Sequence, residues 1–301
     1  MSETLVVVNP TAGGGRAGAA WAAVAAEAAR MAEIRVAQPQ GAAAARAAVQ
    51  DAVARGCERV VAFGGDGTAH LVANALLNAG VGERVTLGVV PAGTGSDLAR
   101  ALAIPRHPLQ ALRRALLGPP APFDAGSCSS EGGSFFFVNI ASAGVGGLVD
   151  QLVNAIPRRG PTTFLLCTLR ALRRYRCVPV RVFADGEGWY EGPILLLAVA
   201  NGTTFGKGMR FAPDAKVDDG LFDLVLVGEV AGLELLRRLP QVYLGRHLGA
   251  KPVHACRARQ VHLEPLAELP VFDVDGETYP SGPATFTLLP AALRVAGNVA
   301  T

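Results

Sequence analysis

The stretch VVAFGGDGTAHLVANALL, residues Val60 to Leu77, decides the fold expected for this chain. It opens with a short apolar run, passes through a glycine-rich turn, and continues with apolar residues at helical spacing. A short apolar run of this kind is typical of a buried strand. A strand that leads through a tight turn into a helix is the repeating unit of an α/β sheet. Asp66 stands inside the turn, beside glycines that leave backbone N–H groups open to a ligand.

The same alternation of patterns runs through the first part of the chain. Short apolar runs predict strands at 5–8, 60–63 and 87–90, and alanine-rich stretches predict helices at 17–31, 42–54, 69–79, 97–102 and 109–117. A break follows at GPPAP, residues 118–122. We therefore expect an α/β domain with a parallel sheet over residues 1–122.

The pattern after residue 122 is richer in strands. We predict strands at 135–140, 178–183, 194–200, 221–227, 261–264, 271–274 and 284–289, and helices at 147–155, 163–175 and 233–244. These segments predict a mostly antiparallel β-sandwich domain over residues 123–301. An alternative for its last strand is that it returns to the first domain.

Composition excludes several classes of protein. Apolar residues make up 50% of the chain, but the apolar runs are shorter than the roughly 20 residues that a membrane-spanning helix needs. The first residues, MSETLVVVNP, have no basic segment before the apolar run, so we expect a cytoplasmic protein. The 5 cysteines form no C-x-x-C pair, and the 5 histidines show no H-x-x-x-H spacing, which argues against disulfides and zinc. With a net charge of only +3 we expect no nucleic-acid partner.

Three glycine-rich turns follow predicted strands: NPTAGGG at 9–15, GGDGT at 64–68 and PAGTGSD at 91–97. In a parallel sheet such turns meet at the carboxyl ends of the strands, where ligands bind. Their N–H groups suit phosphate. One glycine turn after a strand is usually only a turn, but three of them with Arg16 and Asp66 favour a nucleotide site. The residues expected to contact the nucleotide are Asn9, Pro10, Gly13, Gly14, Arg16, Gly64, Gly65, Asp66, Gly67, Thr68, Gly93, Thr94 and Gly95.

Asp66 needs a separate explanation, because a carboxylate repels phosphate unless a cation lies between them. Mg²⁺ is the economical choice, since it binds both carboxylate and phosphate oxygens. Thr68 has two expected roles, as a cap of the helix or as a donor to a phosphate. The chain lacks a G-x-x-x-x-G-K-[ST] loop, a G-x-G-x-x-G motif and a G-x-S-x-G elbow.

NPTAGGGR, GGDGT and PAGTGSDLAR, in this order, closely resemble the catalytic domain shared by diacylglycerol kinases, sphingosine kinases and their bacterial soluble relatives. Residues 201–224 and FDVDGE at 272–277 are similar to second-domain signatures of the bacterial group. NAD kinases share GGDGT but not the third turn. The resemblance implies an α/β domain and a β-sandwich domain of the NAD-kinase and diacylglycerol-kinase type. It also implies an ATP- and Mg²⁺-dependent lipid kinase.

The acid pair in VDGE is the candidate for acid/base chemistry. On one strand, Asp275 and Glu277 would direct their side chains to the same face. Phosphate transfer to an alcohol needs a group that takes the hydroxyl proton. The resemblance gives that role to Glu277 first, with Asp275 as its neighbour or rival. The alternative is a solvated D-G-E hairpin turn.

The segment KVDDGLFD, residues 216–223, is an acidic loop that suits a hard cation. The resemblance implies a structural metal bound by Asp219 and by the backbone carbonyls of Lys216 and Leu221. The competing interpretation is an ordinary D-G turn.

The segment 157–176, PRRGPTTFLLCTLRALRRYR, carries six arginines and no acid. On a helix, Leu165, Leu169 and Leu172 would share a face, and the arginines would meet anionic headgroups. We therefore expect transient contact with the inner membrane surface and a lipid substrate. The alternative is a core-packed helix with a solvated basic edge.

Two departures from the family pattern keep other functions open. His70 and Leu71 stand where the family commonly has Asn-Glu, and residues 37–41 read AQPQG where many bacterial relatives present a threonine. The rivals are a kinase for a soluble alcohol such as NAD, and a non-catalytic nucleotide- or lipid-binding protein. The sequence leaves the lipid open among diacylglycerol, sphingoid bases and ceramide, and it leaves open whether the chain forms a homodimer.

Overall fold

The computed structural model describes residues 3–156, 162–230, 232–269 and 271–298. The chain divides into two compact units. Unit 1 comprises Met1–Ala125 and Leu289–Thr301, and unit 2 comprises Gly126–Leu288. No helix in the described ranges is both long enough and apolar enough to cross a membrane.

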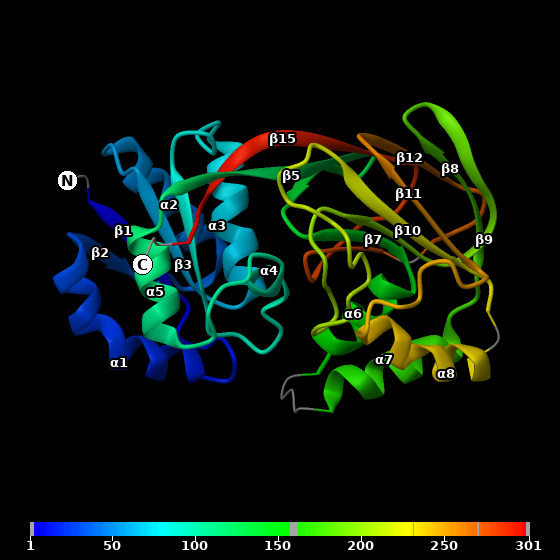
Figure 1. The fold of residues 1–301 in the computed structure, drawn as a ribbon, viewed down its shortest axis with the longest axis horizontal. Helices are drawn as coiled ribbons and strands as arrows, with labels where there is room; N and C mark the ends of the chain where they lie inside the picture. Colours follow the sequence, from blue (N-terminus) through cyan, green and yellow to red (C-terminus); the bar gives the residue numbers. More distant parts are fainter. Residues whose placement is uncertain (1–2, 157–161, 231, 270, 299–301) are drawn as a thin grey trace. The chain divides into compact units, whose positions relative to one another are not determined.

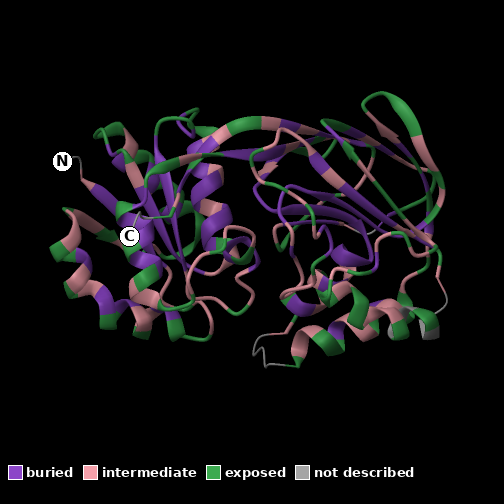
Figure 2. Ribbon diagram, viewed as in Figure 1, coloured by how far each residue is buried: buried purple, intermediate pink, exposed green. Residues whose placement is uncertain are grey.

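Unit 1 is built on a parallel sheet. Its strands, in spatial order, are β2 (Ile34–Ala37), β1 (Thr4–Val8), β3 (Arg59–Gly64), β4 (Thr86–Pro91) and the end of β15 (Ala284–Ala296). The central strands β1, β3 and β4 are mostly apolar and almost entirely buried, as Figure 2 shows in purple. Continuous apolar runs of this kind are characteristic of parallel strands that are covered by helices on both sides.

Helices connect these strands and cover the sheet (Figure 1). They are α1 (Arg16–Met31), α2 (Gly41–Ala54), α3 (Asp66–Asn78), α4 (Asp97–Ala101) and α5 (Pro108–Leu117). Right-handed crossovers place α2 and α3 together on one face and α1 and α5 on the other. Against that second face, Trp21 meets Phe63 edge to face at 5.3 Å between ring centroids.

Three details of unit 1 differ from the sequence prediction. The strand β2 was not predicted, because it is short and lies half-exposed at the edge of the sheet. Helix α3 begins at Asp66 and not at residue 69, so the GGDGT turn continues directly into the helix. The segment 118–122, expected as a break, contains the start of strand β5 (Pro120–Ser130). Proline is tolerated at the first residue of a strand, so the Pro-rich sequence did not prevent it.

Unit 2 is mostly antiparallel. Unit 2 contains the later part of β5 and the first part of β15. The strands between them are β6 (Gly133–Phe137), β7 (Ile140–Gly144), β8 (Val178–Ala184), β9 (Glu187–Ala200), β10 (Phe222–Gly228), β11 (Val253–Ala258), β12 (Gln260–Pro265), β13 (Phe272–Val274) and β14 (Glu277–Tyr279). The long strand β9 pairs with β8 along its first half and with β7 and β10 along its second. The second half of β9 is therefore interior to the sheet.

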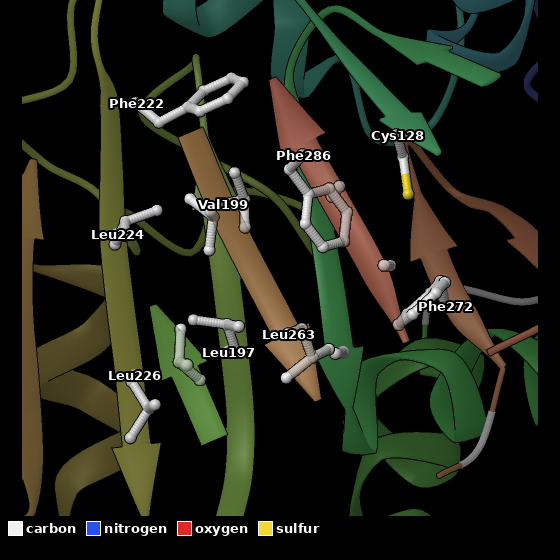
Figure 3. Packing of buried hydrophobic residues seen from close by; sticks show 14 of the residues in the cluster. Cys128, Leu197, Val199, Phe222, Leu224, Leu226, Leu263, Phe272 and Phe286 are labelled. Atoms are coloured by element: carbon white, nitrogen blue, oxygen red, sulfur yellow. The ribbon is translucent and has the colours of Figure 1, made fainter. Parts of the chain in front are cut away.

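The core of unit 2 lies on both sides of these strands. One cluster joins side chains of β9, β10, β12, β13 and β15, including Phe222, Phe272 and Phe286 (Figure 3). A second cluster packs the opposite side of β9 against α6 (Val145–Asn154) and α7 (Thr163–Arg174). The remaining helix is α8 (Gly232–Tyr243). The predicted fold class, a parallel α/β portion followed by a β-sandwich-like portion, is confirmed.

Strand boundaries in unit 2 were predicted less well. The single strand expected at 135–140 is two strands, β6 and β7, because a bend at Val138 and Asn139 interrupts the extended conformation. Strands β11 and β14 were not predicted. Both have largely polar, half-exposed faces that give no clear alternation of apolar residues.

Candidate functional site

The three glycine turns lie at one end of the unit 1 sheet. They follow β1, β3 and β4, which run parallel as neighbours. Backbone hydrogen bonds continue beyond the strands, from Asn9 N–H to Phe63 O at 3.0 Å and from Ala92 N–H to Gly64 O at 2.7 Å. The predicted convergence of the turns is therefore present in the structure.

Arg16 joins the first turn to the third. It is the first residue of α1, and its Nε donates to Gly13 O at 2.9 Å. Its Nη2 lies 3.4 Å from both Gly93 O and Thr94 Oγ1. The first turn lies so close to the third that a Cβ added at Gly13 would be 2.6 Å from the backbone oxygen of Ala92. A guanidinium is thus held at the rim of two glycine turns, where its charge is available to an anion.

Asp66 joins the second turn to the third. Its Oδ1 accepts the backbone N–H of Leu98 at 3.2 Å. Its Oδ2 faces Gly95 so closely that a Cβ there would lie 2.7 Å away. Gly93 in turn lies against Gly65, where a Cβ would overlap the neighbouring Cα. The glycines are needed here because backbone and carboxylate occupy the space that a side chain would take.

The position of Thr68 does not agree with one of its two expected roles, the cap of helix α3. It is buried in the first turn of α3, and the helix has no side-chain cap at its N-terminus. Its hydroxyl accepts the side-chain N–H of Asn9 at 3.3 Å, and Thr11 donates to Asn9 Oδ1 at 2.9 Å. Thr68 therefore fixes the first turn against α3 and does not cap the helix.

The third turn contains an ion pair that the sequence analysis missed. Asp97, buried at the start of α4, pairs with Arg100 at 2.7 Å. Arg100 also donates to Gly95 O. The available signal was the i, i+3 spacing of opposite charges in SDLAR. Ser96, directly before α4, adopts a left-handed conformation (φ 57°) and makes no side-chain cap bond.

The VDGE segment forms a hairpin turn. Strands β13 and β14 pair Val274 with Glu277, which leaves Asp275 and Gly276 as the two turn residues. Both have positive φ, 52° and 89°, as tight two-residue hairpins require. The prediction that Asp275 and Glu277 share one strand face is therefore wrong, because a turn separates them.

Asp275 is held by the backbone. Its Oδ2 accepts the N–H of Val138 at 2.8 Å, and its Oδ1 accepts the N–H groups of Asn139 and Ile140 at 3.0 Å each. Its own N–H donates to Ile140 O at 3.0 Å. The carboxylate of Asp275 therefore binds the backbone N–H groups of the bend between β6 and β7 and fixes its conformation. Glu277, by contrast, has an exposed side chain at the start of β14.

Asp273 is a third acid at the hairpin, and the sequence analysis did not identify it. It is buried on β13, its Oδ1 accepts the Gly276 N–H at 3.0 Å, and its Oδ2 lies 3.4 Å from the Ser142 hydroxyl. Burial, followed by the charge and hydrogen bond of Asp150, raises the pKa of Asp273 well above its usual range. The only available signal was the spacing of acids in FDVDGE.

The guanidinium of Arg257, on β11, lies against the acidic loop before β10. Arg257 lies 3.5 Å from Asp219 Oδ2 and 3.3 Å from Asp223 Oδ1, and it donates to Asp214 O at 3.3 Å. Asp219 Oδ1 accepts the Leu221 N–H at 3.2 Å. Within the described residues no three His, Cys, Asp or Glu side chains form a metal cluster. The donors expected for a metal are carbonyls of Lys216 and Leu221 with one carboxylate, so a metal would share Asp219 with Arg257. The metal stays a prediction.

Comparison with known proteins identifies the fold first. The crystal structure of a diacylglycerol kinase from Bacillus anthracis matches with a TM-score of 0.74 at 22% identity, covering 99% of this chain and 97% of that one. An NAD kinase from Archaeoglobus fulgidus, solved in complex with ATP, matches with a TM-score of 0.54 at 15% identity, covering 98% and 94%. The chain has the NAD-kinase-like fold.

Sequence comparison then identifies the family. Residues 3–128 match the diacylglycerol kinase catalytic domain, and residues 139–297 match the YegS C-terminal NAD kinase beta sandwich-like domain. A diacylglycerol kinase of Mycobacterium tuberculosis is 32% identical over 256 residues, which cover 83% of this chain and 80% of the relative. The chain belongs to the diacylglycerol kinase family and carries a YegS-type C-terminal domain. It is a lipid kinase, an enzyme that transfers phosphate to an alcohol, and membership implies ATP as the donor.

Proposed function

We propose that this enzyme transfers the γ-phosphate of ATP, with Mg²⁺, to the hydroxyl of a diacylglycerol-like or sphingoid lipid. The observation that carries the proposal is the convergence of three glycine turns on Arg16 and Asp66. The turns supply backbone N–H groups, and Arg16 supplies a positive charge, which together suit the phosphates of a nucleotide.

Asp66 fits a magnesium ion at these phosphates. One oxygen is occupied by the Leu98 N–H, and the other faces Gly95, where no side chain fills the space. When bound, Mg²⁺ would neutralise the charge that develops on the transferred phosphate. Asp66 would orient the ion, while Arg16 holds the first and third turns together around the nucleotide.

Glu277 is the proposed base for the acceptor hydroxyl. Its side chain is exposed, whereas both oxygens of Asp275 accept backbone N–H bonds. A base must have an oxygen within hydrogen-bond reach of the proton that it removes. The roles in the VDGE segment are therefore divided: Asp275 fixes the hairpin, and Glu277 takes the proton as the hydroxyl attacks.

Helix α7 supports a contact with the membrane surface. The side chains of Leu165 and Leu166 are 48% and 61% exposed, and Arg170, Arg173 and Arg174 on the same helix are exposed as well. Leucines beside arginines on one exposed helix surface suit a bilayer with anionic headgroups. We propose that this surface, Leu165, Leu166, Arg170, Arg173 and Arg174, docks the enzyme on anionic lipid.

The apolar face of α7 differs from the predicted one. Leu172 is only partly exposed and packs with Phe164 against the second core cluster, while Cys167 and Ala171 are buried in it. The exposed apolar pair is Leu165 and Leu166, not the set Leu165, Leu169 and Leu172. Residues 157–161, with two of the six arginines, lie outside the described residues.

The test is transfer of labelled γ-phosphate from ATP and Mg²⁺ to a panel of lipid alcohols in mixed micelles, with NAD and glycerol alongside. The proposal expects label in one lipid class and its loss in Glu277→Gln. The control is Glu187→Gln, which removes another exposed carboxylate from unit 2. Label only in NAD or glycerol would make the enzyme a soluble-alcohol kinase. ATP binding without any transfer would indicate a non-catalytic protein.

A further inference from the structure

The hairpin that carries Glu277 rests on two carboxyl groups, the buried Asp273 and the half-buried Asp150. Asp273 lies on β13, directly before the turn, and Asp150 lies on α6. Asp273 Oδ2 faces α6, because a Cβ added at Gly146 would lie 3.6 Å from it. Asp150 lies one helical turn beyond Gly146 on the same face of α6, where its charge and its side-chain hydrogen bond act on Asp273. Helix α6 packs against both β13 and β14, so this pair joins the helix to the hairpin.

Two carboxyl groups at hydrogen-bond distance cannot both be ionised at little cost, because like charges repel strongly in a buried site. A single shared proton removes the repulsion and supplies the donor that the bond needs. The charged groups acting on Asp273 are Asp150 from α6 and Asp275 from the turn, and both are acidic. Strand β7 contributes the uncharged Ser142, and the turn contributes the Gly276 N–H.

We propose that Asp150 and Asp273 share one proton and that Asp273 is a positioning residue for Glu277. This inference rests on the proposed role of Glu277. Asp273 acts through the turn: its Oδ1 binds the Gly276 N–H, and Gly276 directly precedes Glu277. The shared proton holds α6 against β13 and so fixes the base of the hairpin. Loss of that proton places two negative charges between α6 and β13 and moves the turn.

The direction of the pH effect follows from the raised pKa of Asp273. A carboxyl with a raised pKa in the folded state contributes stability that is fully present below its unfolded pKa of about 4. That contribution is lost as the pH rises through the folded value. Rising pH therefore weakens both the packing of α6 and the placement of Glu277.

The decisive variants are Asp273→Asn and Asp273→Ala. The Asn side chain keeps an oxygen for Gly276 and offers Asp150 an N–H that does not titrate, whereas Ala removes both contacts. We expect Asp273→Ala to lower kcat about 100-fold with KM for ATP unchanged, the size of effect that a displaced catalytic group produces. Asp273→Asn should rescue most of that loss and flatten the fall of kcat at high pH. Glu187→Gln is the matched exposed control and should keep the wild-type pH profile.

Two measurements need no substrate. The infrared spectrum should show a protonated carboxyl at neutral pH that disappears in Asp273→Asn and persists in Glu187→Gln. The midpoint of thermal unfolding should fall less with rising pH in Asp273→Asn than in the wild type. An unchanged infrared band or an unchanged pH slope in Asp273→Asn overturns the shared proton. An unchanged kcat in a folded Asp273→Ala overturns the positioning role. A wild-type enzyme with no transferase activity would refute the proposed function, while the spectrum and the unfolding midpoints still decide the shared proton.

Discussion

The carboxylate of Asp66 accepts the backbone N–H of Leu98 at 3.2 Å, across 32 positions of sequence. This bond joins the start of α3 to the start of α4, so the second and third glycine turns keep a fixed spacing. Only one of the two carboxylate oxygens is used for this purpose. The other, Oδ2, faces Gly95 of the third turn, where a Cβ would lie 2.7 Å from it.

Replacing Asp66 should separate structure from catalysis. Asp66→Asn keeps an oxygen for the Leu98 N–H but loses the charge that orients Mg²⁺. We expect kcat to fall about 100-fold or more, because a preorganised electrostatic contact is lost. The γ-phosphate transfer assay measures this, and unfolding curves should change little. Asp51→Asn, an exposed carboxylate of the same unit, is the control. Full activity in Asp66→Asn would contradict the site.

Gly95→Ala should damage the nucleotide site by crowding. Its Cβ would lie 2.7 Å from Asp66 Oδ2, so the carboxylate must move. Overpacking of this kind costs about 1–3 kcal/mol, and we expect the KM for ATP to rise about tenfold. Steady-state kinetics at varied ATP measure the change. Gly188→Ala meets no atom within 4 Å and should leave the KM as it is. Equal KM values in both variants would mean that ATP binds elsewhere.

Neutralising the arginines of α7 should weaken membrane binding. Each basic side chain near an anionic bilayer contributes about 1 kcal/mol, so the triple variant Arg170→Gln, Arg173→Gln and Arg174→Gln should bind about 100-fold more weakly. Flotation with phosphatidylglycerol vesicles measures this, and added salt should weaken wild-type binding in the same way.

The control for this experiment carries the same loss of charge on exposed arginines of unit 1: Arg46→Gln, Arg84→Gln and Arg106→Gln. Equal binding by the two triple variants would show that α7 makes no special contact. If added salt does not weaken the binding of the wild type to the vesicles, the interaction is not electrostatic.

Arg257 should determine how the acidic loop responds to pH and to Mg²⁺. Burial raises the pKa of Asp223, Arg257 lowers it, and Asp219 and Asp214 raise it again. In Arg257→Gln that pKa should rise further, so stability falls as the pH rises through the raised value. The loss of these partly exposed pairs should cost up to about 1 kcal/mol at neutral pH.

Thermal unfolding with and without Mg²⁺ tests the metal prediction in the same variant. If Asp219 binds a metal, removal of the competing guanidinium should enlarge the stabilisation by Mg²⁺, and Asp219→Asn should abolish it. An Mg²⁺ response that is the same in Arg257→Gln and Asp219→Asn would place the ion elsewhere.

The sequence predicted the fold best where one physical signal dominated. Continuous apolar runs identified β1, β3 and β4, because parallel strands between two helix layers are apolar on both faces. Edge and hairpin strands such as β2 and β14 were missed, because their half-exposed residues do not alternate. The extension of β5 into the Pro-rich segment lies outside its pairing with β6, which covers residues 126–130, and β15 is the other partner of β5, a pairing that no local pattern shows.

The site was predictable in part for a similar reason. Glycine turns after strands are visible locally, and the parallel topology brings them together. The hairpin at Asp275 was named only as the alternative to a shared strand face, although D-G is a strong signal of a two-residue hairpin turn. The roles of Asp273 and Arg257 depend on partners more than 30 positions away, Ser142 and Asp223 among them. Tertiary contacts of that kind leave no periodic signal.

Strand β15 begins in unit 2 and ends in unit 1, where Arg294 and Val295 pair with Thr86 and Leu87 of β4. A ribosome therefore finishes the α/β unit only after it has made the whole β-rich unit. Until then β4 has an unpaired edge, and the places of Leu293 and Val295 in the core are unfilled. The nascent chain must tolerate this open edge for more than half of its synthesis, a period in which chaperones would find exposed strand and apolar surface.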